Sequence, residues 1–186
     1  MVEVLGSDDI VISTTGKTSR ELYECREARG EGHDRDFLTV GSMGHTSSIA
    51  AGFATARPER RVICLDGDGS MIMHMGAMAI IGNMKPENLL HIVINNGVHD
   101  SVGGQSTVGL DIDMPAIAKA CGYRNALCVQ EANRIREAIE RLWTMSGPAF
   151  LEVRARKGSR EDLGRPTTTP KENQNVLMKR LGIDKE

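Results

Sequence analysis

The chain has 186 residues, of which 40% are hydrophobic and 26% charged, enough for one ordinary domain with a buried core. Its 23 Lys and Arg against 25 Asp and Glu leave a net charge of −2 and no basic stripe, which argues against a nucleic-acid partner. Apolar runs fall short of the roughly 20 residues that cross a bilayer, and the N-terminus lacks the regions of a signal peptide, so we expect a cytoplasmic protein without a membrane segment.

The cysteines show no pattern of a metal site or of a disulfide framework. None of them forms a CxxC pair; they are Cys25, Cys64, Cys121 and Cys128. We therefore expect buried or free thiols.

Along the chain, short β-branched runs alternate with longer helical patterns. This alternation predicts an α/β domain with a mainly parallel sheet. Strands are expected at residues 9–16, 60–66, 89–96 and 148–155. Helices are expected at residues 18–29, 47–56, 70–83, 114–123, 131–143 and 171–181, with loops at 30–38 and 97–109.

The junction at Asp66-Gly67-Asp68-Gly69-Ser70 lies where a buried strand passes into a helix. The N–H groups of a helix N-terminus attract phosphate, whereas a carboxylate repels it. A Mg²⁺ ion between carboxylate and phosphate oxygens resolves this conflict. The junction therefore predicts a metal-bridged phosphate site.

A second oxygen ligand is expected from the end of the next strand. Asn96 lies 28 residues after Asp68, an interval that fits a strand, a helix and a parallel strand. A right-handed crossover would bring the two strand ends side by side. The alternative is a pair of unrelated turns, because Gly-Asp and Asn-Gly are common turn formers.

The GDGS motif, the helix-length gap and the Asn pair together resemble the fingerprint of thiamine diphosphate enzymes. The resemblance implies a thiamine diphosphate-binding fold, here a three-layer α/β domain, with Mg²⁺ as the second cofactor. It implies that Asp68, the Asn96 side chain and the main-chain oxygen of Val98 ligate Mg²⁺, while Asn95 is structural. The implied cofactor contacts also include Gly67, Gly69 and Ser70.

The segment Val40 to Ser48 resembles the loop that holds the aminopyrimidine ring in the same enzymes. In that pattern the Gly41 carbonyl accepts a hydrogen bond from the ring amino group. Met43 is the apolar wedge that bends the cofactor. Without the resemblance, Met43 would be interpreted as ordinary core.

Several blocks between Thr14 and Pro170, such as NNGVHDSVGGQ and DLGRPTTTP, resemble the phosphonopyruvate decarboxylase family, with sulfopyruvate decarboxylase as a close relative. The likeness covers only the cofactor-binding half, with residues 1–186 as the diphosphate-binding domain and 157–186 as a C-terminal extension. It implies a lyase that converts 3-phosphonopyruvate to phosphonoacetaldehyde and CO₂. In the family, the glutamate that activates the pyrimidine lies on another domain. The resemblance therefore implies a separate pyrimidine-binding α subunit, in an α2β2 or larger assembly.

The start of the helix after the first strand supplies candidate anion contacts. Lys17, Thr18 and Ser19 could bind the phosphonate or the diphosphate, since a helix N-terminus with Lys and hydroxyl groups suits either. The alternative is that Thr18 or Ser19 caps the helix and Lys17 is solvated.

Two histidines lie close to the expected site and could transfer a proton. His45 follows the pyrimidine loop, and His99 follows the proposed metal ligands. His33, His74 and His91 are interpreted as structural.

Two rival functions remain open. One is a noncatalytic module that binds thiamine diphosphate or a phosphorylated ligand. The other is a different thiamine enzyme, such as a split acetolactate synthase or a 2-oxoacid oxidoreductase subunit, although the chain lacks the Cys spacing of iron–sulfur clusters.

Overall fold

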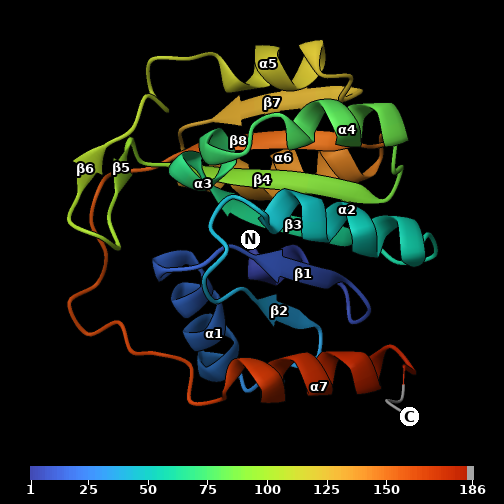
Figure 1. Cartoon of the computed structure of the whole chain (residues 1–186), viewed down its shortest axis with the longest axis vertical. Helices are drawn as coiled ribbons and strands as arrows, with labels where there is room; N and C mark the ends of the chain where they lie inside the picture. Colours follow the sequence, from blue (N-terminus) through green and yellow to red (C-terminus); the bar gives the residue numbers. More distant parts are fainter. Residues whose placement is uncertain (184–186) are drawn as a thin grey trace.

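A computed structural model of the chain describes residues 1–183. Its centre is a parallel sheet of six strands in the order β2-β1-β3-β4-β8-β7 (Figure 1). The strands are β1 (Ile10–Ser13), β2 (Asp36–Leu38), β3 (Val62–Gly67), β4 (Leu89–Asn95), β7 (Asn125–Val129) and β8 (Ala149–Arg154). The central strands are nearly continuously buried, as expected for a parallel sheet with both faces covered.

Helices cover both faces of the sheet, so the predicted three-layer α/β fold is confirmed. One core joins the sheet to the N-terminal 3₁₀ turn and two helices, α1 (Lys17–Ala28) and α6 (Ile135–Trp143). The other core joins it to α2 (Thr46–Ala56), α3 (Asp68–Met73), α4 (Ala77–Met84), α5 (Met114–Ala120) and α7 (Pro170–Arg180). Helix α7 lies beyond the edge strand β2 (Figure 1).

The structure corrects three expectations about elements. Residues 36–38, expected as loop, form β2, and β7 was not predicted at all. The single helix expected at 70–83 is two helices, because the chain leaves the helical path between His74 and Gly76. The loop at Gly44 packs tightly there: a Cβ on this glycine would lie 2.3 Å from Cδ2 of His74.

The predicted loop 97–109 carries a short antiparallel hairpin, β5 (Val98–His99) with β6 (Gln105–Ser106). The 3₁₀ turn η2 (Ala132–Arg134) precedes α6. All four cysteines are free, as expected. None of the helices in residues 1–183 combines the length and the apolar character that a bilayer crossing needs.

The strand order reverses direction between β1 and β3. From β1 the chain proceeds through α1 to β2 on one side, and from β3 it proceeds to β4 on the other. The carboxyl ends of strands at such a switch point form a crevice, which is where open α/β sheets bind ligands.

Candidate active site

A cavity of about 450 Å³ opens at this switch point. Its walls come from the segments that follow β1, β3, β4 and β8, together with α1. Ten of the predicted site residues line it: Lys17, Thr18, Met43, Gly67, Asp68, Gly69, Ser70, Asn96, Val98 and His99. Gly41, Ser19 and His45 are not among the lining residues.

The Asp68 carboxylate is 3% exposed and lies in the first turn of α3. The Thr107 hydroxyl, on the returning arm of the 97–109 loop, donates a hydrogen bond to its Oδ2. The arm approaches so closely that a Cβ on Gly109 would lie 2.7 Å from the same oxygen. The loop therefore fixes the orientation of this carboxylate.

Asn96 lines the cavity, and two hydrogen bonds hold its side chain. Its Nδ2 donates to Oδ2 of Asp100 at 2.7 Å, and its Oδ1 accepts from the Val98 N–H at 3.1 Å. Asn96 and Val98 thus form one compact turn that lines the same cavity as Asp68.

Asn95 is buried beneath this turn, and its Oδ1 accepts from the Gly97 N–H at 3.3 Å. Its Nδ2 donates to the Gly109 carbonyl and to Glu152 Oε1, both at 2.7 Å. These bonds hold the loop arm and give Asn95 a structural setting.

Ser70 joins three segments that are distant in sequence. Its hydroxyl accepts from Thr14 Oγ1 at 3.0 Å and from the Gly44 N–H at 3.1 Å. The end of β1 and the 40–45 loop are therefore fixed to the start of α3. Within the loop, Met43 is half-buried against the cavity, whereas Gly41 is exposed.

The N-terminus of α1 opens toward the cavity without a side-chain cap. The N-cap is Gly16, with φ of 96°, so neither Thr18 nor Ser19 caps the helix. Ser19 is buried and its hydroxyl donates to the Thr14 carbonyl, so the structure does not bring this predicted substrate contact to the cavity. The uncapped N–H groups of the first turn, with Lys17 and Thr18, are candidate contacts for an anion.

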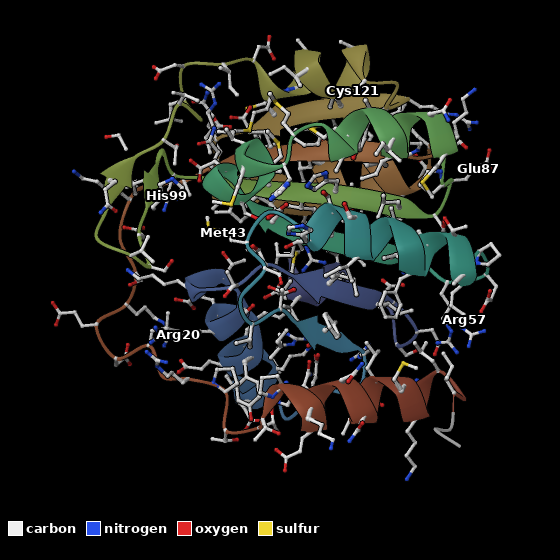
Figure 2. The ribbon with its side chains drawn as sticks, in the orientation of Figure 1. Arg20, Met43, Arg57, Glu87, His99 and Cys121 are labelled. Atoms are coloured by element: carbon white, nitrogen blue, oxygen red, sulfur yellow. The ribbon has the colours of Figure 1, made fainter. Side chains whose placement is uncertain are left out.

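The two candidate histidines occupy different settings. His99 lies over the Asp68-Gly69 turn, so close that a Cβ on Gly69 would be 2.3 Å from its Cε1. His45 is exposed, with its ring centroid 4.2 Å from that of His74. Figure 2 shows His99 and Met43 in the same half of the view, carried by different segments.

These donors suit a magnesium diphosphate. A carboxylate, an amide oxygen and a main-chain carbonyl are hard ligands, and a helix N-terminus lies opposite them. A Cβ on Gly67 would meet no atom within 4 Å, so the turn leaves open space where a phosphate group could rest on the backbone.

Sequence reasoning missed several residues of this site. Thr107 carried no signal, because its importance arises from a loop that folds back on itself. Asp100 lies within the NNGVHDSVGGQ block, but no role was assigned to it. The cavity is also lined by Thr14, Glu21, Ser101, Arg156 and Ser159. Of these, Thr14 begins the recognised blocks and Ser101 lies within the NNGVHDSVGGQ block, but neither was assigned a role.

Comparisons with known proteins agree with this geometry. Residues 14–153 match the family described as "Thiamine pyrophosphate enzyme, C-terminal TPP binding domain". Phosphonopyruvate decarboxylase of Streptomyces viridochromogenes is 42% identical over 90% of this chain and 41% of its own length. The chain thus spans about two fifths of that relative.

A relative of more similar length is sulfopyruvate decarboxylase subunit beta of Methanothermobacter thermautotrophicus, 35% identical over 82% of this chain and 76% of the relative. In fold, the chain resembles a structure titled as a thiamin diphosphate-dependent enzyme from Mycobacterium smegmatis. The TM-score is 0.65 at 20% identity, over 84% of this chain and 30% of that one.

Proposed function

The chain belongs to the family of thiamine pyrophosphate enzymes, and on that premise we propose that it is the diphosphate-binding part of a Mg²⁺-dependent 2-oxoacid decarboxylase. The observation that carries the proposal is the convergence of Asp68, Asn96 and Val98 on one cavity beside the uncapped start of α1.

In this proposal Asp68, Asn96 and the Val98 carbonyl hold Mg²⁺. Gly67, Gly69 and Ser70 carry the diphosphate, with Thr18 at the start of α1, while Met43 and Gly41 meet the rest of the cofactor. Thiamine diphosphate supplies the nucleophilic carbon and the electron sink for loss of CO₂. His99, which lines the cavity, is the better-placed of the two histidines for proton transfer; His45 would need a contact across an interface.

The proposed substrate is 3-phosphonopyruvate, giving phosphonoacetaldehyde. Two relatives named phosphonopyruvate decarboxylase, at 42% and 41% identity, support it. Sulfopyruvate is the alternative, because relatives named as beta subunits of sulfopyruvate decarboxylase match the chain over most of their length. Lys17, on the cavity wall, offers positive charge to either acid.

We further propose that a pyrimidine-binding α subunit supplies the activating glutamate, in an α2β2 or larger assembly. Apolar side chains stand exposed on the pyrimidine loop and on α3 and α4, where another chain could cover them. They are Val40, Met73, Ile80 and Met84, all at least 45% exposed.

The test is reconstitution. The purified chain, thiamine diphosphate and Mg²⁺ are titrated with a pyrimidine-domain chain, and aldehyde release is measured from phosphonopyruvate and from sulfopyruvate. We expect no turnover by either chain alone and a sharp stoichiometric endpoint on mixing. A partner whose activating glutamate is replaced by glutamine is the matched control and should give no turnover.

Turnover by this chain alone, in a preparation shown by mass spectrometry to contain nothing else, would contradict the split site. Tight thiamine diphosphate binding without decarboxylation in the reconstituted assembly would favour a noncatalytic module instead.

A further inference from the structure

The segment from Ala155 to Thr169, here named the strap, connects β8 to α7. It runs past the β5–β6 hairpin and down one side of the molecule to α7 (Figure 1). It contains no helix or strand, yet its first part, from Ala155 to Ser159, helps to line the cavity. The C-terminal extension is therefore part of the site.

The far half of the strap is tied to α1. Arg20 donates to the carbonyls of Leu163 and Gly164, and Glu24 accepts from the Gly164 N–H and from Arg160. Further along, the hydroxyl groups of Tyr23 and Thr167 lie 2.7 Å apart. Figure 2 shows Arg20 on the same side of the molecule as the strap.

The near half is tied to the proposed metal turn. The Gly158 N–H donates to Oδ2 of Asp100 at 2.9 Å, and this same oxygen accepts from Asn96. Asp100 therefore connects the strap directly to a proposed Mg²⁺ ligand. This anchor places Arg156 and Ser159 at the cavity wall.

The charges of the strap divide into two groups. Arg160 pairs with Glu21 and Glu24, away from the cavity centre. By contrast, Arg156 and Lys17 line the cavity and make no ion pair with any residue in the described part of the chain. The acids beside them are engaged: Asp68 with Thr107, and Asp100 with Asn96 and Gly158.

The position of Arg156 separates it from the expected diphosphate contacts. Those contacts follow β1 and β3, whereas Arg156 follows β8, on the opposite side of β4 in the sheet order. Asn96 at the end of β4 lies between them. A second anion would thus meet Arg156 across the metal turn from the diphosphate.

We propose that Arg156, supported by the Ser159 hydroxyl, binds the phosphonate or sulfonate group of the substrate and so selects 2-oxoacids that carry a second acid group. The inference rests on the proposed function and adds the residue that sets its specificity. A planar guanidinium can donate two parallel hydrogen bonds to a tetrahedral oxyanion. A 2-oxoacid without a second acid group has no such oxyanion, so it would not gain these hydrogen bonds.

The test uses Arg156→Gln, with Lys157→Gln as the matched control from the same strap but outside the cavity lining. The full chain with thiamine diphosphate and Mg²⁺ is titrated calorimetrically with phosphonoacetate, a nonreacting carboxylate that bears a phosphonate. We expect the Kd of the Arg156 variant to rise about 10- to 100-fold, the range for a hydrogen bond to a charged group. The Lys157 variant should bind as the wild type does.

The affinity for thiamine diphosphate, measured in parallel, separates the proposal from a cofactor role. It should be unchanged in Arg156→Gln. An equal loss of cofactor and phosphonoacetate affinity would overturn the assignment, as would unchanged phosphonoacetate binding or its absence in the wild type.

In the reconstituted assembly, kcat/KM for the accepted acid should fall by the same factor. If neither acid is decarboxylated while Arg156 still governs phosphonoacetate binding, the proposed reaction fails and the anion site stands.

Discussion

Two polar clusters occupy opposite ends of the sheet. They differ in whether their polar groups are enclosed by protein partners or face a cavity. Near the amino ends of the strands, Arg26 donates to both oxygens of Asp36, at 2.9 and 2.8 Å, and to Glu31 at 2.6 Å. At the carboxyl ends, Asp68 and Asn96 also have protein partners, but they face a cavity.

The first cluster is closed and the second is open. The Arg26 side chain is 1% exposed, and its charge is matched by carboxylates that are themselves held in place. A buried charge pair of this kind is costly to break and offers no free ligand position. The open cluster places hard oxygen ligands on the wall of a cavity, and such ligands are the ones that Mg²⁺ prefers. We therefore expect mutations in the closed cluster to affect folding and those in the open cluster to affect binding.

The largest expected effect is that of Asp68→Ala on cofactor binding. Removing a proposed Mg²⁺ ligand should weaken Mg²⁺-dependent thiamine diphosphate binding by more than the roughly 10- to 100-fold that loss of an outer-sphere group costs. Calorimetry with and without Mg²⁺ measures the change, and exposed Asp111→Ala is the control. Normal Mg²⁺-dependent binding by the Asp68 variant would refute the site assignment.

Breaking the closed cluster should instead lower stability. Arg26→Ala leaves Asp36 buried and unpaired, and we expect a loss of about 3 to 5 kcal/mol in the free energy of unfolding. Arg29→Ala, at the C-cap of the same helix, removes an ion pair whose arginine is 40% exposed, and should cost at most about 1 kcal/mol. Urea denaturation compares the two variants; equal losses would show that burial does not distinguish them.

The fold class was predictable because hydrophobic runs and their spacing carry it. The strands β1, β3, β4 and β8 are mostly apolar, and all four were expected near their observed positions. The short edge strand β2 begins with Asp36, whose partner Arg26 is distant from any strand pattern. Such a strand depends on a tertiary ion pair, which periodicity cannot reveal.

The candidate site was predictable where a motif carried it. The spacing from Asp68 to Asn96 placed both at one cavity. Contacts made by returning loops were not predictable: Thr107 lies 39 residues from Asp68, and Arg156 lines the cavity only because the strap passes it on the way to α1. No local pattern distinguishes these residues from other Thr and Arg residues in the chain.

A smaller effect is expected for Thr107→Val. Valine has nearly the same shape as threonine but lacks the hydroxyl that donates to Asp68 Oδ2. The Asp68 carboxylate therefore remains, but its orientation is no longer fixed by this bond. We expect Mg²⁺ affinity to fall toward the lower end of the roughly 10- to 100-fold range for such partners. Thr55→Val, which removes a bond to the Ala51 carbonyl within α2, should leave Mg²⁺ affinity unchanged. Similar affinity in both variants would mean that Thr107 does not orient Asp68.

The smallest effect concerns Glu31, at the half-exposed rim of the closed cluster, and it appears only in acid. Hydrogen bonds from Arg26 and then Arg29 lower the pKa of its carboxyl from 4.5 to about 2. Because the folded pKa is the lower one, the carboxylate stabilises the native state fully above pH 4.5, and this contribution is lost as the pH falls toward 2. Wild type should therefore unfold at higher urea than Glu31→Gln near neutral pH, and the gap should close between pH 4.5 and 2. Exposed Glu137→Gln corrects for the loss of one carboxylate elsewhere. A difference in urea midpoint that persists unchanged at pH 2 would show that the charge of Glu31 is not the cause of the stabilisation.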